Sequence, residues 1–271
     1  GFSGDPRSVA FGTWSRSGYG RAIAFQQPAS KQDRPGVVIG VPTYKAGGVA
    51  IGRVALFGLD ANAVVTEQAL SSIEGKPGSR LGQRVSWAGD VNGDGYADVL
   101  VGAPQFNGRL HAEGAVFLQC GTGGRLESRP AWIVYGEQKD CQLGNSFAGG
   151  ADVNHDGFAD VLVGRPNYKN KDGSLGRVDL YLGRKTGLPV TPDWTGKRPN
   201  TDGRYGAEVA FLGDVDGDGL DDAAFSAGAE RGARSASTVF VHLGTAAGFQ
   251  DQPAWTLSGE QSVAGFGETI T

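Results

Sequence analysis

The chain has 271 residues, of which 46 are glycine and 39% are hydrophobic, and its formal net charge is −4. This length and hydrophobic fraction suit one large domain with a core, and the many glycines suit a fold rich in tight turns. The sequence contains no run of 18 apolar residues, which excludes a membrane-spanning helix. The slight negative charge gives no reason to expect a nucleic-acid partner.

The sequence repeats with a period of 62 residues, which is the interval from Asp90 to Asp152 and from Asp152 to Asp214. The same interval separates four glycines that each follow a large apolar residue: Gly20, Gly82, Gly144 and Gly206. A fixed period indicates a repeat architecture. We therefore expect a single domain over residues 1–271. Its expected parts are a lead-in outer strand (1–18), four repeats (19–80, 81–142, 143–204 and 205–261) and the start of a fifth (262–271).

Each repeat is expected to form four β-strands and no helix. In the third repeat the strands are predicted at Ser146–Asp152, Ala159–Val163, Gly176–Leu182 and Pro192–Thr195. Four-stranded units that recur in this way indicate an all-β protein, a β-propeller with one blade per repeat. Tryptophans recur at one phase of the repeat, on the outermost strand: Trp132, Trp194 and Trp255. We expect them to pack between blades rather than to stack on a ligand.

Three repeats carry a short acidic loop between their first two strands, at residues 90–98, 152–160 and 214–222. Side-chain oxygens fall at loop positions 1, 3, 5 and 9, and glycine stands at position 6, where a tight turn needs a positive φ. These oxygens and the backbone carbonyl of position 7 are ligands that Ca²⁺ prefers. The sequence predicts three Ca²⁺ sites with the ligands Asp90, Asn92, Asp94, Tyr96 and Asp98; Asp152, Asn154, Asp156, Phe158 and Asp160; and Asp214, Asp216, Asp218, Leu220 and Asp222.

The loops are not EF-hands, because position 12 carries Val101, Val163 or Phe225 instead of the Glu that an EF-hand requires. An acidic turn without an ion is the alternative, but the three or four carboxylates of each loop would then repel one another. The first repeat is degenerate. Its four ligand positions carry Pro28, Ser30, Gln32 and Gly36, so we expect no ion there.

An apolar-Gly pair, an Asp-rich loop and a Gly-Ala-Pro turn follow one another in the repeats, as in Leu81-Gly82, Asp90 to Asp98 and Gly102-Ala103-Pro104. This combination closely resembles the FG-GAP repeat, which builds the propeller head of integrin α subunits and many secreted bacterial proteins. The resemblance implies a Ca²⁺-binding propeller and suggests a secreted bacterial member. It carries the family's Ca²⁺ ligands onto the three intact loops. It leaves the function open, because the fold hosts adhesion, sugar binding and some lyases.

Four repeats and a fragment leave two alternatives for the ring. Either the two ends of the chain share a small extra blade, or the chain is part of a larger propeller, seven-bladed as in integrin-like heads. In the second case an exposed apolar blade face must be covered by a partner chain or a further segment.

Cys120 and Cys141 are the only cysteines, and an even number without a third is typical of an oxidising compartment. We expect a disulfide between them, with two separate thiols as the alternative. Ca²⁺ loops of modest affinity also suit the extracellular space. The expected location is secreted, cell-surface or periplasmic.

The loops at the other end of the strands from the acidic loops are expected to form the recognition surface. They differ most between repeats, as binding loops on a scaffold do, and they hold twelve Lys or Arg against eight Asp or Glu. The candidate ligand-binding residues are Tyr44, Lys45, Phe106, Asn107, Arg109, His111, Asn167, Tyr168, Lys169, Lys171, Arg231 and Arg234. A solvated loop face without a ligand is the alternative.

The sequence offers no catalytic constellation. His111, His155 and His242 fall at unrelated phases of the repeat, and no nucleophile elbow, zinc-protease motif or phosphate loop occurs. We therefore expect a calcium-stabilised extracellular binding, adhesion or assembly module for a protein or glycan partner, and not an enzyme. The alternative is a lyase-like polysaccharide-active enzyme or its carbohydrate-binding accessory domain.

Overall fold

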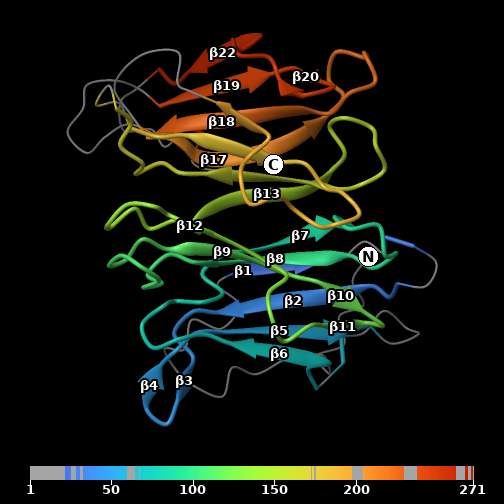
Figure 1. The fold of residues 1–271 in the computed structure, drawn as a ribbon, viewed down its shortest axis with the longest axis vertical. Coiled ribbons are helices and arrows are strands. Elements are labelled where there is room, and N and C mark those ends of the chain that lie inside the picture. Colours follow the sequence, from blue (N-terminus) through green and yellow to red (C-terminus); the bar gives the residue numbers. More distant parts are fainter. Residues whose placement is uncertain are drawn as a thin grey trace.

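The computed structural model contains strands and turns but no helix in the part of the chain that it describes. The described residues are 22–25, 29–30, 33–59, 65–66, 68–171, 173, 175–196, 204–228, 237–260, 266–267 and 270. Four antiparallel sheets of four strands each stack in chain order, which confirms the all-β fold built of propeller blades (Figure 1). None of the described elements is a long apolar helix of the kind that crosses a membrane.

The four blades take their strands from the chain in sequence order, beginning with the strand that contacts the neighbouring blades. Blade 1 contains β1 (Ala22–Phe25), β2 (Gly36–Val41), β5 (Arg53–Gly58) and β6 (Ser71–Glu74). Blade 2 contains β7 (Val85–Gly89), β8 (Asp98–Ala103), β9 (Ala115–Gln119) and β12 (Trp132–Tyr135). Blade 3 contains β13 (Ser146–Ala151), β14 (Asp160–Gly164), β15 (Val178–Tyr181) and β16 (Trp194–Gly196). Blade 4 contains β17 (Arg204–Gly213), β18 (Asp222–Gly228), β19 (Thr238–His242) and β22 (Trp255–Ser258). The strands predicted in the third repeat are those of blade 3, with ends shifted by one or two residues.

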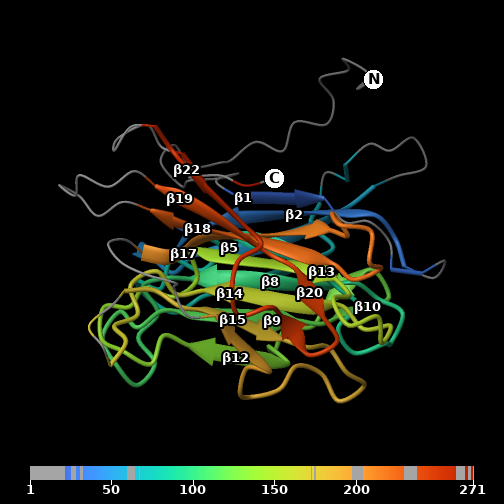
Figure 2. The same ribbon diagram turned by 90° about the horizontal axis from the view of Figure 1, so that it is seen from above.

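Short hairpins mark the two ends of the blades. β3 (Lys45–Ala46) pairs with β4 (Val49–Ala50) in the connection from second to third strand of blade 1. Two other hairpins follow the third strands of blades 2 and 4: β10 (Gly121–Thr122) with β11 (Arg125–Leu126), and β20 (Gly244–Thr245) with β21 (Gly248–Phe249). The first hairpin and the other two lie at opposite ends of the strands (Figures 1 and 2). The antiparallel topology thus gives the blades two separate loop faces.

Neighbouring blades approach each other most closely at pairs of glycines: Gly40 with Gly82, Gly102 with Gly144, and Gly164 with Gly206. A Cβ atom on the first glycine of each pair would lie 2.1, 2.0 or 2.2 Å from the carbonyl oxygen of the second. The second glycines have φ values of 83°, 110° and 79°, a region that other residues rarely adopt. Glycine is therefore required on both sides of each junction, and these are the glycines of the repeated sequence motif.

Tryptophans of the outer strands fill the junctions that follow blades 2 and 3. The Trp132 ring meets the Tyr181 ring edge-on at 4.8 Å, and its Nε1 donates to the Pro189 carbonyl at 2.7 Å. Trp194 packs in the same way against Phe249 of blade 4, with ring centroids 5.4 Å apart. Trp255 belongs to the last blade of the stack and is 47% exposed. The expected packing between blades is thus found for two of the three tryptophans.

Blade 1 lacks this tryptophan. Ser71 pairs with Leu56 of the third strand as Trp132 pairs with Leu118, so Ser71 occupies the equivalent position. A groove of about 280 Å³ remains between the outer strands of blades 1 and 2, lined in part by Ile73, Phe106, Phe117, Ile133 and Tyr135. The first repeat therefore departs from the others in its packing as well as in its loop.

The expected disulfide is wrong, because Cys120 and Cys141 lie at opposite ends of blade 2 as free, buried thiols. Cys120 follows β9 at the acidic-loop end, where the Asn92 amide nitrogen lies 3.7 Å from its Sγ. Cys141 lies in the opposite connection, where its carbonyl accepts a hydrogen bond from Asn167 at 3.1 Å. The four paired residues of β9 and β12 lie between them. At about 3.4 Å per residue this length exceeds the span of a disulfide, about 7 Å between Cα atoms.

The first prediction compares Trp132→Ala with Trp255→Ala as its matched control. Trp132 is 7% exposed and wedged between blades, so its truncation is expected to lower the free energy of unfolding by about 3–5 kcal/mol. Trp255 lacks such a neighbour among the described residues, and its truncation should cost less than about 1 kcal/mol. Urea denaturation measures both values, and equal losses would contradict the assigned packing.

Candidate metal centres and recognition face

The acidic loops lie at one end of blades 2, 3 and 4, each between the first and second strand. We call them loop 2 (residues 90–98), loop 3 (152–160) and loop 4 (214–222). Their position-6 glycines, Gly95, Gly157 and Gly219, have φ values of 89°, 89° and 92°. A Cβ on Gly157 or Gly219 would meet no atom within 4 Å, so backbone conformation rather than crowding calls for glycine. The predicted tight turn is present in all three loops.

Backbone N–H groups organise the acidic side chains of each loop. In loop 2 the Asp90 carboxylate accepts hydrogen bonds from the N–H groups of Gly93, Asp94 and Gly95 at 2.7, 3.1 and 2.7 Å. Asp94 accepts one from the Tyr96 N–H at 2.9 Å. Loop 4 repeats this set from Asp214 and Asp218. In loop 3 the position-4 N–H belongs to His155 (φ 55°) and donates to the Asp152 carbonyl at 3.4 Å instead.

The side chains at positions 1, 3 and 5 lie close together. In loop 4, carboxylate oxygens of Asp214, Asp216 and Asp218 all lie within 4.8 Å of one another. In loops 2 and 3 position 3 is Asn, whose amide oxygen accepts the position-5 N–H at 2.9 and 3.2 Å. Carboxylate and amide oxygens around one point are the donor set that Ca²⁺ takes. The residues present therefore fit a calcium ion.

The position-9 aspartates also connect each loop to the body of its blade. Asp98 is fully buried and accepts hydrogen bonds from Val91 N at 3.2 Å and Gly121 N at 2.9 Å. The equivalent bonds of Asp160 and Asp222 are 2.7–2.8 Å long. Burial raises the pKa of both Asp98 and Asp160 to about 7. Sequence reasoning predicted these residues only as ligands and missed their structural role.

The predicted ligand-binding residues lie in different environments. Phe106 is 7% exposed and packs on Phe117 at 5.3 Å and Tyr135 at 6.1 Å, in the lining of the groove between blades 1 and 2. Tyr44 packs under Arg53, and Tyr168 under Arg177. The exposed members are Lys45, Asn107, Arg109, His111, Lys169 and Lys171. Arg231 and Arg234 lie outside the described residues.

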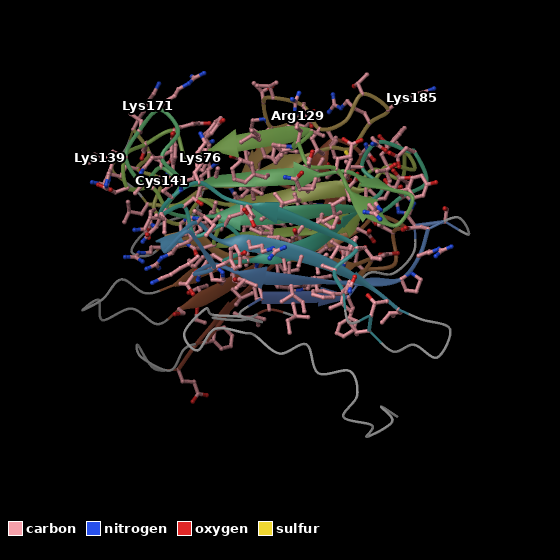
Figure 3. The ribbon with its side chains drawn as sticks, turned by 90° about the horizontal axis from the view of Figure 1, so that it is seen from below. Lys76, Arg129, Lys139, Cys141, Lys171 and Lys185 are labelled. Carbon is pink, nitrogen blue, oxygen red and sulfur yellow. The ribbon has the colours of Figure 1, made fainter. Side chains whose placement is uncertain are left out.

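A polar groove of about 550 Å³ runs between the connections of blades 2 and 3. Its lining comprises Gln138, Lys139, Asp140, Gln142, Asn167, Lys169, Leu175 and Arg204. Gln138 exchanges two hydrogen bonds with the Lys169 backbone at 2.9 Å, and His111 Nδ1 lies 2.8 Å from Asp140. Figure 3 shows Lys139 and Lys171 at this end of the strands and Lys185 at the other. The list of candidate residues left out Gln138, Lys139, Asp140 and Gln142, which carry no motif, although they belong to the loops of this face.

A buried ion-pair cluster joins blades 2 and 3 beside the groove. Arg165 is fully buried; it forms an ion pair with Asp179 at 2.5 Å and donates to the Tyr135 carbonyl at 2.8 Å. Arg177 also pairs with Asp179, at 2.9 Å. Burial alone would lower the pKa of Arg165, but Asp179 raises it beyond its usual value, so the guanidinium stays charged. The sequence signal was Arg165 itself, which replaces the Ala of Gly-Ala-Pro.

Comparison with known proteins identifies the class. Residues 81–118 and 143–181 match the FG-GAP repeat. The chain therefore contains FG-GAP repeats, as the sequence resemblance implied.

Three relatives are integrin α chains. Integrin alpha-4 of Xenopus laevis is 33% identical over 159 residues, which cover 56% of this chain and 15% of the relative. Integrin alpha-5 of Xenopus laevis is 32% identical over 204 residues (72% and 18%), and integrin alpha-PS2 of Drosophila melanogaster is 30% identical over 184 residues (65% and 12%). The chain thus spans less than a fifth of these relatives. They are animal proteins and lend no support to the expected bacterial source.

The second prediction concerns metal removal. Without Ca²⁺ the crowded carboxylates of each loop repel one another, so folding is expected to be linked to metal concentration. EDTA should lower the melting temperature by several degrees, and Asp94→Ala, Asp156→Ala and Asp218→Ala should each reduce the bound Ca²⁺ by one from a total of three. Elemental analysis and calorimetry measure both effects; a fourth strongly bound ion, or a melting curve indifferent to EDTA, would contradict the assignment.

The third prediction follows from Asp98 and Asp160, whose pKa values rise from 3.8 to about 7. Between these values the folded metal-free protein holds more protons than the unfolded chain, so the free energy of unfolding falls as pH rises. The slope is at most about 1.4 kcal/mol per pH unit and per group. Urea titrations in EDTA from pH 4 to 8 should show this fall, and the double variant Asp98→Asn/Asp160→Asn should flatten it. An unchanged slope in the double variant would contradict the assignment.

Proposed function

We propose that this chain is a calcium-stabilised binding module of an extracellular or cell-surface protein, with an adhesion role. One observation carries the proposal: the blades place three sets of inward-turned oxygens at one end and a polar groove with basic residues at the other. The first face would hold Ca²⁺ and the second would recognise a protein or glycan. Both faces are built on the same strands, so the metal stabilises the scaffold on which the recognition loops stand.

In the proposed metal sites the side chains at positions 1, 3, 5 and 9 and the carbonyl of position 7 would hold the ion. Bound Ca²⁺ would neutralise the clustered carboxylates. The chain's own part is to present these oxygens already turned inward by backbone N–H groups, as for Asp90 and Asp214. This arrangement lowers the entropy lost when the ion binds.

The groove between blades 2 and 3 suits an acidic partner. Its lining contains three basic residues, Lys139, Lys169 and Arg204, and one carboxylate, that of Asp140. Lys171 stands on the same loop as Lys169. Positive groups at a recognition surface steer an acidic protein or glycan by attraction that weakens as salt rises. Binding rather than catalysis is proposed because the three histidines lie apart. His242 is buried between Tyr205 and Gln250, His155 lies in loop 3, and His111 lies on the recognition face.

The two ends of the blade stack favour a role in assembly. β1 exposes Ile23 (53%) and Phe25 (61%), and β22 exposes Trp255 (47%) and Leu257 (53%). These strands belong to blades 1 and 4, at opposite ends of the stack (Figure 1). Exposed apolar side chains on sheet faces indicate surfaces that further protein covers. We propose that further blades, from the same protein or a partner, complete the propeller there.

The fourth prediction tests the recognition face with charge reversals of equal size. Lys169→Glu/Lys171→Glu should weaken binding to acidic peptides or acidic glycans on an array at least about tenfold, with a smaller effect at high salt. The control Arg129→Glu/Lys185→Glu changes the net charge by the same amount at positions away from the groove, and it should have little effect on binding. Neither variant should change the melting temperature. Equal losses in both variants, or a loss in the control alone, would place the binding surface elsewhere.

A further inference from the structure

Hydrogen bonds join the metal loops of neighbouring blades into a row. The Ala159 N–H of loop 3 donates to the Asp90 carbonyl of loop 2 at 2.9 Å. The Arg184 N–H, which follows the third strand of blade 3, donates to the Val91 carbonyl at 3.0 Å. On the other side of loop 2, the Ala97 N–H donates to Asp33 Oδ2 of blade 1 at 3.1 Å. Each loop is therefore held partly by the blade before it.

Two of these bonds, those donated by Ala159 and Ala97, hold a peptide group whose carbonyl is an expected metal ligand. The C=O of loop position 7 and the N–H of position 8 belong to one planar peptide, so fixing the direction of the N–H fixes that of the carbonyl. In loop 3 this is the Phe158–Ala159 peptide, and its acceptor is Asp90. In loop 2 it is the Tyr96–Ala97 peptide, and its acceptor is Asp33.

The acceptor of the Ala159 N–H is the carbonyl of Asp90, an expected metal ligand of loop 2. Asp90 stands at position 1, and its carboxylate is the one organised by Gly93, Asp94 and Gly95. An ion that fixes the Asp90 side chain would also fix its carbonyl and, through Ala159, aim the Phe158 carbonyl at the next site. Blade 1 supplies the same support from a loop that lacks the ligand set. Ser30 adds a hydrogen bond to the Gly95 carbonyl at 2.6 Å.

We propose that Ca²⁺ binding in loops 2 and 3 is positively coupled through the Phe158–Ala159 peptide, and that Asp33 is a positioning residue for the loop 2 site. This inference rests on the proposed binding of Ca²⁺. Ordering one loop lowers the entropy lost when the other binds, and the coupling is reciprocal. Loop 4 is joined to loop 3 differently: Asp221 Oδ2 accepts the Asp152 N–H at 3.2 Å. The peptide group of this N–H contains no carbonyl that is an expected ligand. Among the described residues no hydrogen bond joins loop 2 to loop 4, so we expect no coupling between these two sites.

Calorimetric Ca²⁺ titrations of the whole chain test the coupling. Asp218→Ala leaves loops 2 and 3, Asp94→Ala/Asp218→Ala leaves loop 3, and Asp156→Ala/Asp218→Ala leaves loop 2. The product of the two association constants measured in Asp218→Ala should be at least about fivefold larger than the product of the constants measured in the two single-site variants. The matched pair of loops 2 and 4, left by Asp156→Ala, should give a ratio near one against its single-site variants. A ratio near one for loops 2 and 3 would overturn the coupling and leave metal binding intact, whereas no binding in any variant would overturn the proposed function itself.

Asp33 is tested where loop 2 is the only intact site, in the Asp156→Ala/Asp218→Ala background. Asp33→Ala removes the acceptor of the Ala97 N–H and should weaken Ca²⁺ binding about fivefold. Asp33→Asn removes the charge but can still present an oxygen to Ala97, so it should retain most of the affinity. An unchanged affinity in Asp33→Ala, or an equal loss in both variants, would overturn the positioning role.

Discussion

The close contact between glycines at each blade junction is the constraint on which the structure depends. At the tightest junction the Gly144 carbonyl oxygen lies where a Cβ of Gly102 would be 2.0 Å away. Adjacent strands can approach this closely only if neither carries a side chain there. A second set of close contacts lies at the acidic-loop end, beside the Ala159-to-Asp90 bond: a Cβ on Gly89 would be 2.5 Å from the Ala159 Cβ, and a Cβ on Gly149 would be 2.7 Å from the Ala88 Cα. Packing between blades thus fixes the geometry of the acidic loops at one edge of the stack.

The proposed function assigns two tasks that would conflict in one place to the two ends of the strands. Metal sites need converging carboxylates and fixed backbone, while a recognition surface needs loops free to differ from repeat to repeat. Antiparallel four-stranded blades provide one end for each. The buried pair of Arg165 and Asp179 and its bond to Tyr135 stiffen the groove end without any metal. Each end therefore has its own source of rigidity.

Much of the fold could be predicted from the sequence because the repeat fixes it. Strand order, blade 3 boundaries and the loop turns all follow from a 62-residue period with glycine and aspartate at set phases. The period does not specify the contacts of side chains that belong to no motif. A disulfide between Cys120 and Cys141 was expected from their number alone, but the strand pairing puts them at opposite ends of a blade. Phe106 lies in a variable loop, yet its ring turns into the apolar space between blades.

The degenerate first repeat shows why sequence patterns understate what a residue does. Its loop lacks the expected ligand residues, and its outer strand carries Ser71 in place of the junction tryptophan. Yet Asp33 stands at no ligand position. Its carboxylate accepts the Ala97 N–H of loop 2, as the Asp90 carbonyl of loop 2 accepts the Ala159 N–H of loop 3. A side-chain oxygen thus replaces a main-chain oxygen as the acceptor of the position-8 N–H. Because such a role depends on the neighbouring blade rather than on the residue's own repeat, no alignment of the repeats within this sequence could have revealed it.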